Sequence, residues 1–388
     1  MSAAQGLALQ ERAAERAAPP SVVLLSHWGR SGYNVLRALN AMGAKTFLIH
    51  DQRSASLRLS RCCKVVHSAS EIAEADPAVV ARIINDLHDA VGLDSVIASD
   101  VESLTLLARV KADLRAPVFP IAELDTLLAL NSKWDFYKLC VAHGVAVPKT
   151  LFFEDKSAID PDAIAAELGF PVVVKPVAGY GQRGVLVLAD RRDMLARFLR
   201  DPSYAYGAVV VQEFVEGCDW ALSVFARHGR IEHWTAWACP GQLEAGYGVG
   251  RFLVTTFCDR RDLMEMGERI IAATNFSGVA NFDARLDARS GTMKMFECNP
   301  RFFNRMLAAR FCGLDFVRAG LPRFEGGSRT SLDQKQYYPW QELFSLRGAR
   351  RLLSGEWKPS LLARDVYELL IDPLPPIVRK LTREDART

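Results

Sequence analysis

The sequence lacks the features of membrane, secreted and disulfide-stapled proteins. No apolar run reaches the ~18 residues that a membrane-spanning helix needs, and residues 1–20 contain no apolar stretch of the kind found in signal peptides. The 8 cysteines are scattered without the spacing of metal ligands, which favours reduced thiols. These absences predict a cytoplasmic protein without a membrane span, in which residues 1–20 form a flexible tail.

The sequence also has little excess charge and neither of the common phosphate-binding loops. Its net charge of +3 is too small to indicate nucleic acid as the main partner. It contains no GxxxxGK[ST] P-loop, and Gly29 and Gly32 do not complete a GxGxxG dinucleotide motif. A P-loop enzyme is therefore disfavoured, and so is a typical nucleotide-binding dehydrogenase.

A length of 388 residues predicts more than one structural unit, because single cores stop growing near ~250–300 residues. Apolar runs such as Val22–Leu25 and Ser95–Ala98 alternate with helical patterns over residues 21–120, which predicts an α/β unit with a parallel sheet. Residues 206–300 have strand character, interrupted by a helical pattern at Asp262–Thr274. This part predicts an antiparallel sheet with helices on one side.

A lysine and a glycine-rich loop follow one of the expected strands. Lys175 comes directly after the apolar run Val172–Val174, and Gly179, Gly181 and Gly184 follow it. A lysine in that place can direct its ammonium group toward phosphate oxygens, while backbone amides of the loop approach them from another side. A plain turn between two strands of a hairpin would give the same pattern.

A second segment combines extended backbone with an acid. A strand ending at Gln212 runs into Glu213, Phe214 and Val215, and Asp219 follows two residues after a glycine. Backbone N–H and C=O groups of such a segment can pair with an adenine edge, and a carboxylate can accept hydrogen bonds from ribose hydroxyls. A strand that ends in a solvated acidic turn is the alternative.

Two carboxylates and one amide are expected on one face of a hairpin. Glu297 and Asn299 are two residues apart, so their side chains leave the same face of a strand. Asp283 lies on the strand across the turn at Ser290-Gly291 and can reach that face. Such oxygen donors suit Mg²⁺ that bridges phosphates. Because Phe282 next to Asp283 is apolar, we expect the acids to lie beside a hydrophobic core and not in a solvent-exposed stretch of charged residues.

These signals, together with Lys133 in Asn131-Ser132-Lys133, occur in an order known from one protein family. Over about residues 21–320 the sequence resembles the ATP-grasp superfamily, specifically its carboxylate–amine ligase branch. That branch includes the D-alanine–D-alanine ligase, biotin carboxylase and carbamoyl-phosphate synthetase types. Each signal is common by itself, whereas all of them in this order make the resemblance specific.

The resemblance implies a role for each phosphate and metal motif. Asn131-Ser132-Lys133 is similar to the family's N-[DS]-K element and Val174-Lys175-Pro176 to its VKP strand, so both lysines would contact nucleotide phosphates. Residues 179–184 resemble the mobile glycine-rich lid. Glu297-Cys298-Asn299-Pro300-Arg301 is similar to the E-x-N-P-R motif. Asp283, Glu297 and Asn299 would then hold the metal, and Arg301 would bind the transferred phosphate.

The resemblance also implies the contacts of the nucleoside. Gln212 and Glu213 would face the adenine amino group, with Phe214 next to them in the same segment. The Val215 amide would meet a ring nitrogen, and Asp219 would bind the ribose.

The implied fold is α/β plus α+β, with a Rossmann-like pre-ATP-grasp domain followed by a two-subdomain ATP-grasp fold. The expected units are a flexible tail over 1–20, a pre-ATP-grasp domain over 21–120, a small subdomain with the lid over 121–205, a large subdomain with the metal site over 206–325 and a C-terminal helical extension over 326–388.

The implied activity is that of an ADP-forming ligase. The enzyme would phosphorylate a small carboxylic acid to an acyl phosphate and couple it to an amine, with Lys175 and Arg301 as catalytic residues. The implied cofactors are ATP and Mg²⁺, with Mn²⁺ as an alternative ion. The partners would be the acid and the amine and no nucleic acid, and a homodimer is compatible with the resemblance.

Some parts of the sequence depart from the family or are not explained by it. Phe302-Phe303-Asn304 follows Arg301 where many relatives have a small turn, and residues 233–252 match no acceptor-binding pattern. The loops Ser26–Gly32 and Ser99–Glu102 follow expected strands. Since α/β sheets bind ligands at the carboxyl ends of their strands, we expect the acid substrate to approach from these loops.

Three alternatives stay open at this point. A dehydrogenase would use Asp51 at the end of the second strand, although nothing downstream suits hydride transfer. A non-catalytic or regulatory ATP-binding protein could keep the fold, although the complete set of expected metal ligands argues against it. A ligase with a hydroxyl or thiol nucleophile would share every motif named above.

Overall fold

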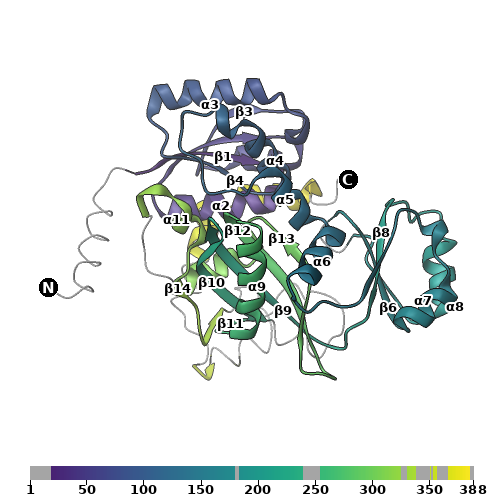
Figure 1. The fold of residues 1–388 in the computed structure, drawn as a ribbon. Coiled ribbons are helices and arrows are strands. Elements are labelled where there is room, and N and C mark those ends of the chain that lie inside the picture. The colour runs from purple at the N-terminus through teal and green to yellow at the C-terminus, as the bar shows by residue number, and fades with distance from the viewer. Residues whose placement is uncertain are drawn as a thin grey trace.

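The computed structural model describes residues 19–179, 183–238, 254–324, 330–337, 350, 353–355 and 366–384. Within these residues the chain forms a parallel sheet, a small antiparallel sheet and a large, mostly antiparallel sheet (Figure 1). The tail at residues 1–18, Gly181, and about half of the expected C-terminal extension lie outside the described residues.

The parallel sheet has the strand order β3-β2-β1-β4. Its strands are β1 (Ser21–Ser26), β2 (Lys45–His50), β3 (Lys64–Ser68) and β4 (Ser95–Ala98). The associated helices are α2 (Gly29–Ala41), η1 (Gln52–Leu59), η2 (Ile72–Glu74), α3 (Pro77–Val91), α4 (Val101–Val110) and η3 (Lys111–Asp113). All six residues of β1 are buried, as expected for a parallel strand covered on both faces.

The turn expected at Ser26–Gly32 is shorter than predicted, because α2 already begins at Gly29. A Cβ atom on Gly32 would lie 2.2 Å from Ser26 Oγ and 2.6 Å from a methyl group of Leu57. Gly32 therefore allows α2 to pack closely on its surroundings. The prediction was wrong here because glycine at a close packing contact and glycine in a turn look the same in the sequence.

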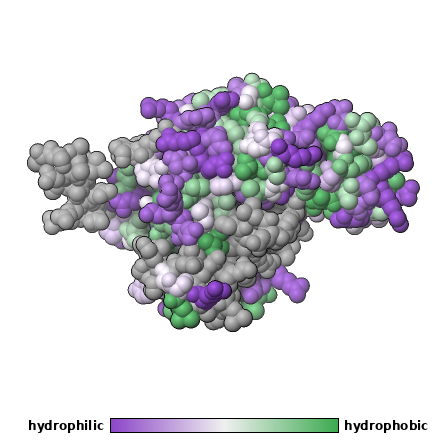
Figure 2. All heavy atoms as spheres, turned by 90° about the horizontal axis from the view of Figure 1, so that it is seen from below, coloured by the Kyte–Doolittle hydropathy of each residue, from purple (hydrophilic) through white to green (hydrophobic). Residues whose placement is uncertain are grey.

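The small sheet has the order β5-β8-β6-β7, and all its pairs are antiparallel. Its strands are β5 (Thr150–Phe153), β6 (Val172–Pro176), β7 (Leu186–Leu188) and β8 (Val209–Glu213). The helices beside it are η4 (Lys156–Ala158), α7 (Pro161–Leu168), α8 (Arg191–Met194) and the π-helix η5 (Leu195–Leu199). Seen from below, this lobe projects from one side of the molecule and carries many hydrophilic residues (Figure 2).

The expected hairpin of β6 and β7 is present. The sequence grouped β8 with the strands that follow it, but β8 lies between β5 and β6. Alternation and β-branched residues indicate that a segment is a strand, whereas its partner depends on contacts distant in the chain.

The large sheet has the order β13-β12-β9-β10-β11-β15, and β14 pairs with β10. Its strands are β9 (Gly217–Arg227), β10 (Arg230–Ala238), β11 (Thr255–Cys258), β12 (Gly278–Asp287), β13 (Met293–Asn299), β14 (Thr330–Ser331) and β15 (Lys335–Tyr337). Helix α9 (Arg261–Ala273) covers one face, where Leu263 and Ile270 are fully buried (Figure 1). The opposite face of β9, β12 and β13 carries the polar residues described below.

Two helices connect the parallel sheet to the small sheet. Helix α5 (Leu124–Asn131) ends where α6 (Lys133–Ala142) begins, and the Ser132 hydroxyl accepts a hydrogen bond from Asp135 N as the cap of α6. The expected break at Asn131-Ser132 is thus confirmed. Helix α6 packs on β13, which brings its first residue to the large sheet (Figure 1).

After β13 the chain returns to the parallel sheet. The helices are α10 (Met306–Phe311), α11 (Phe316–Gly320), η7 (Pro322–Phe324) and α14 (Leu374–Leu381). Helix α14 packs on η1 and α2, so the C-terminal segment, yellow in Figure 1, lies against the N-terminal part of the chain. Among the described residues, no helix is long and apolar enough to cross a bilayer.

Candidate active site

Asp283 and Glu297 are paired across the antiparallel strands β12 and β13, and both are half-buried. Burial raises the pKa of Asp283 to about 7, and the negative charge of Glu297 adds to this rise. Asn281 Nδ2 and Asn299 Nδ2 each donate a hydrogen bond to Asp283, at 2.9 and 3.1 Å. Two carboxylates and two amides therefore meet on one sheet face, as the alternation of Glu297 and Asn299 predicted.

Lys133, the first residue of α6, is buried beside this carboxylate pair. Its Nζ lies 3.3 Å from Glu297 Oε1 and donates a hydrogen bond to Gly179 O at 3.1 Å. The Lys133 amide also bonds to Val177 O. The start of α6 is thus tied to the segment after β6, which places the lysine between the two antiparallel sheets.

Lys175 lies on β6, in the small sheet, and reaches toward the large sheet. Its Nζ donates a hydrogen bond to Gln212 Oε1 at 2.9 Å and lies 4.3 Å from the ring centre of Phe296 on β13. Burial lowers the pKa of Lys175 to about 8, although the charges of Glu297 and Asp283 oppose this shift. A buried ammonium with so low a pKa suits a site that receives an anion.

The glycine loop is described only at its ends. Gly179 has a φ of +134°, and Gly184 has a φ of +69°. A Cβ atom on Gly184 would lie 2.7 Å from Pro176 Cγ, so the loop closes tightly on the end of β6. Gly181 falls outside the described residues.

The expected adenine segment begins on β8. Gln212 is buried between the Lys175 ammonium and the Thr150 hydroxyl, to which its Nε2 donates at 2.8 Å. The Glu213 carboxylate is paired with Lys294 at 2.7 Å. Its side chain thus links the small sheet to β13, and an adenine contact of Glu213 would have to use the backbone. Phe214 N donates to Pro171 O, and Val215 is buried.

Asp219 lies on β9 opposite Arg285 of β12. Arg285 Nε is 3.2 Å from Asp219 Oδ1, and the guanidinium also donates to Gly217 O. Burial raises the pKa of Asp219, while the charges of Arg285 and Lys175 oppose the rise. Sequence reasoning missed Arg285, although its position two residues after Asp283 places it on the same face of β12.

Arg301 follows β13 and is turned toward the end of that strand. Its Nη2 donates to Asn299 Oδ1 at 3.0 Å, and its Nη1 donates to Phe302 O at 3.1 Å. The Asn299 amide therefore presents its nitrogen to Asp283 and its oxygen to Arg301. Arg301 adjoins the carboxylate pair through this amide.

A chain of hydrogen bonds that sequence reasoning missed continues from the carboxylates across the sheet. Trp237 Nε1 donates to Ser223 Oγ at 3.0 Å, and Ser223 Oγ donates to Asn281 Oδ1 at 2.8 Å. Asn281 then donates to Asp283. The sequence signal for this chain was Asn281, which lies two residues before Asp283 and therefore on the same face of β12. The register between β12 and β9, which brings Ser223 to Asn281, could not be predicted from the sequence.

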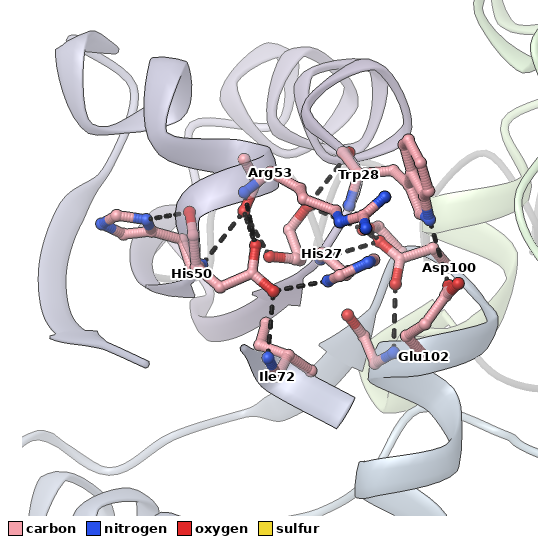
Figure 3. A network of polar contacts seen from close by, with 12 residues as sticks. His27, Trp28, His50, Arg53, Ile72, Asp100 and Glu102 are labelled. Atoms are coloured by element: carbon pink, nitrogen blue, oxygen red, sulfur yellow. Dashed lines mark hydrogen bonds and ion pairs between the residues drawn. The ribbon is translucent and has the colours of Figure 1, made fainter. Parts of the chain in front are cut away.

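A second polar cluster lies at the carboxyl ends of β1, β2 and β4 (Figure 3). His27 Nδ1 and Asp51 Oδ2 are 2.5 Å apart, and Asp51 also accepts from Arg53 N and Ile72 N. Burial disfavours the charged imidazole, but Asp51 outweighs it and raises the pKa of His27. The buried Asp51 carboxylate is thus bound within the protein, which weakens the dehydrogenase alternative.

The mouth of this cluster is half-buried and carries both signs of charge. Asp100 Oδ2 accepts from the amides of His27 and Trp28, and Trp28 Nε1 donates to Glu102 Oε2 at 3.1 Å (Figure 3). The Arg53 guanidinium lies 5.4 Å from the Trp28 ring. Burial raises the pKa of Glu102, and the charge of Asp100 adds to this effect.

One narrow cavity brings the end of β4 close to the residues that follow β13. Ala98, at the end of β4, and the segment 300–302 line one narrow cavity between the parallel and large sheets. The expected substrate loop after β4 therefore begins near Arg301 of the E-x-N-P-R motif.

Asp283, Glu297 and Asn299 carry oxygen donors of the kind that a divalent cation binds. The described residues contain no group of three His, Cys, Asp or Glu side chains that could hold a metal. Asp283 and Glu297 nevertheless form an acidic pair, and burial together with their mutual repulsion raises the pKa of Asp283. A cation would relieve this repulsion, and the Asn299 amide would supply a third oxygen after turning over. The residues therefore fit Mg²⁺.

Comparison with known proteins agrees with the sequence signals. The family model of an ATP-grasp domain matches residues 130–243. The D-aspartate ligase of Enterococcus faecium (strain Aus0004) is 24% identical over 217 residues, which are 52% of this chain and 51% of that protein. The chain thus spans about half the length of this curated relative.

Solved structures share the fold at low sequence identity. The L-amino acid ligase from Bacillus licheniformis has a TM-score of 0.59 at 15% identity and covers 82% of this chain and 76% of its own. The biotin carboxylase domain of the Hydrogenobacter thermophilus 2-oxoglutarate carboxylase, in complex with MgADP, ADP and bicarbonate, has a TM-score of 0.62 at 16% identity. That match covers 81% of this chain and 71% of the other.

The predicted fold class is confirmed by the parallel sheet, the two following sheets and these structural neighbours. The matched segment 130–243 contains Lys133, Lys175 and the stretch from Gln212 to Asp219. Residues 130–243 of the chain therefore match the ATP-grasp domain family, and the chain as a whole shares the fold of these solved structures.

Proposed function

We propose that this chain is an ATP-dependent ligase that phosphorylates a carboxylate to an acyl phosphate and couples it to an amine, releasing ADP and phosphate. The observation that carries the proposal is the meeting of groups from three elements. Lys133 of α6 lies 3.3 Å from Glu297 of β13, and Lys175 of β6 lies over Phe296 of the same strand. Cations from one side thus face carboxylates from the other.

The lysines would neutralise and orient the triphosphate. Lys175 is held by Gln212, and Lys133 is held by Glu297 and Gly179 O, so both ammonium groups are positioned before the nucleotide binds. Fixed charges of this kind contribute to phosphoryl transfer mainly by positioning and by electrostatic stabilisation. Gly179, Gly181 and Gly184 belong to the loop that would cover the phosphates.

Asp283, Glu297 and Asn299 would hold Mg²⁺. The ion, when bound, would neutralise negative charge on the phosphates. Mn²⁺ accepts similar oxygen ligands and is an alternative ion. Arg301 would leave the Asn299 oxygen and contact the transferred phosphoryl group, because a guanidinium matches phosphate geometry.

The nucleoside would lie along β8 and the start of β9. Backbone groups from Glu213 to Val215, with Phe214 between them, would receive the adenine, and Asp219 would bind the ribose while Arg285 holds its carboxylate. Gln212 would stay near the adenine amino group. These assignments rest on the family resemblance and on the placement of all five residues beside Lys175 or on adjacent strand segments.

The substrates would approach from the loops after β1 and β4. Trp28, Arg53 and Glu102 form a half-buried mouth with one cation and one carboxylate. Ala98, at the start of the loop that carries Glu102, lines the same cavity as Arg301. Amino acids carry both a carboxylate and an amine, and the relatives are a D-aspartate ligase and an L-amino acid ligase. Amino acids are therefore the first substrates to test.

The decisive experiment follows the transfer of an oxygen atom from the acid substrate to the released phosphate. The chain is incubated with ATP, Mg²⁺, an amine panel and acids whose carboxylates carry heavy oxygen. An acyl phosphate intermediate predicts that one labelled oxygen appears in the released phosphate and that ADP forms in equal amount. Mg²⁺-dependent ATP binding without ADP formation across the panel would favour a non-catalytic binding protein. Product analysis distinguishes an amine from a hydroxyl or thiol nucleophile.

A further inference from the structure

Large apolar side chains are exposed along the C-terminal segment 366–384. Their exposed fractions range from 44% at Leu374 to 77% at Leu381. They recur every three or four residues through the helical residues 366–371 and α14, so they follow helical spacing. We call them the C-terminal stripe, which consists of Tyr367, Leu370, Leu374, Ile377 and Leu381.

The opposite side of the segment is anchored to the protein by two buried acids. Asp372 accepts hydrogen bonds from Ser60 Oγ at 2.6 Å and from Arg61 N at 3.0 Å. Glu384 accepts from the amide and the hydroxyl of Ser56, at 2.8 and 2.5 Å. Turning the stripe inward would break these bonds and leave carboxylates buried without partners, which is costly.

A third acid, Glu368, also anchors this segment to the rest of the protein. Glu368 forms ion pairs with Arg37 of α2 and Arg310 of α10, and its side chain is largely buried. All acids between residues 366 and 384 thus point into the protein. The charged residues that remain exposed on this segment are Lys380 and Arg383.

We propose that the C-terminal stripe docks on an anionic lipid surface, with its apolar side chains in the interface and Lys380 and Arg383 near the lipid phosphates. Within residues 366–384 the exposed charges beside the stripe are positive, which is the pattern of helices that lie in a bilayer interface. A second copy of the chain fits the charges less well, because a symmetric contact would bring two sets of cations together and residues 366–384 offer no exposed acid to pair with them.

The test uses the full chain and vesicle flotation. We expect the chain to float with phosphatidylcholine vesicles that contain about 30% phosphatidylglycerol, to bind pure phosphatidylcholine less, and to dissociate as salt is raised. Leu370→Glu and Ile377→Glu should each lower the partition coefficient roughly tenfold. Lys380→Gln and Arg383→Gln should each lower it about fivefold, because one cation near an anionic surface contributes about that factor.

Val141→Glu is the matched control, since Val141 is an exposed apolar residue of α6 outside the stripe. It should leave flotation unchanged. Thermal melting of each variant checks that the fold is kept, and the charge variants replace exposed side chains that no core contact requires. A wild-type chain that stays with the vesicle-free fraction would overturn the proposal. So would a dimer, seen by sedimentation, that Leu370→Glu dissociates while lipid binding is absent.

Discussion

Asp283 of β12 and Glu297 of β13 face each other across an antiparallel pair, and Lys133 from α6 lies against the second of them. The same carboxylate pair is bounded by Asn281 and Asn299, which both donate to Asp283. These groups come from three elements, namely β12, β13 and α6. The site therefore exists only when the connecting helix α6 and the large sheet are packed together, and its predicted properties can be tested one group at a time.

Lys175 should make ATP binding depend on pH. Its pKa in the fold is about 8, below the ordinary value of 10.5, so the free protein loses the ammonium charge as pH rises through 8. The triphosphate binds the charged form, so affinity should fall above that pH and binding should be accompanied by proton uptake. Isothermal titration in buffers of different ionisation enthalpy measures the uptake.

Lys175→Arg is the control for this effect, because a guanidinium keeps its charge over the whole range. The variant is expected to bind without proton uptake near pH 8. Equal uptake by the variant and the wild type would assign the effect to another group and contradict the role given to Lys175.

Gly217 should be required for the nucleotide segment and for stability. It has a φ of +144°, and a Cβ atom there would lie 1.8 Å from Leu286 O, a backbone atom that cannot yield easily. Gly217→Ala should lower the free energy of unfolding by more than about 3 kcal/mol and weaken ATP binding, because the strand pairing with β12 must shift. Urea denaturation measures the stability.

Gly291→Ala is the matched comparison. Gly291 has a φ of +67°, and nothing lies within 4 Å of its added Cβ atom. Only the backbone preference is lost, so the cost should be about 1 kcal/mol. Similar losses at both positions would mean that the close approach to Leu286 O is relieved by a small movement.

Ser223 should influence metal binding although it contacts the carboxylates only through Asn281. Ser223→Ala removes the donor to Asn281 Oδ1, and the freed amide can turn away from Asp283. We expect the Mg²⁺ concentration for half-maximal ATP binding to rise roughly tenfold, by analogy with the loss of outer-shell partners at metal sites. Thr274→Ala, which removes a hydroxyl at the end of α9, should leave that concentration unchanged.

Glu102 should affect a substrate without affecting the nucleotide. Its half-buried carboxylate accepts a hydrogen bond from Trp28 Nε1 at the mouth of the second polar cluster, at the carboxyl ends of β1, β2 and β4. Glu102→Gln should raise the KM of one substrate about tenfold or more and leave the KM of ATP near that of wild type, because one charged contact is lost. Glu74→Gln, on the exposed side of η2, is the control. A change in the KM of ATP alone would contradict this placement.

The sequence predicted those features that depend on local pattern. The two-residue spacing of Glu297 and Asn299 placed both on one face, and the Asn131-Ser132 break placed Lys133 at a helix start. It could not predict that Glu213 pairs with Lys294 or that Arg285 pairs with Asp219, because these contacts depend on the register between strands distant in the chain. The membership of β8 in the small sheet was misjudged for the same reason.

The most direct test measures Mg²⁺-dependent ADP formation by wild type and by Glu297→Gln at matched concentrations of acid, amine and ATP. The substitution keeps the size of the side chain and removes the carboxylate charge that faces Lys133 and the expected ion. The account predicts a loss of at least about 100-fold, with a melting temperature close to wild type. Turnover equal to that of wild type, over the same Mg²⁺ range, would contradict it.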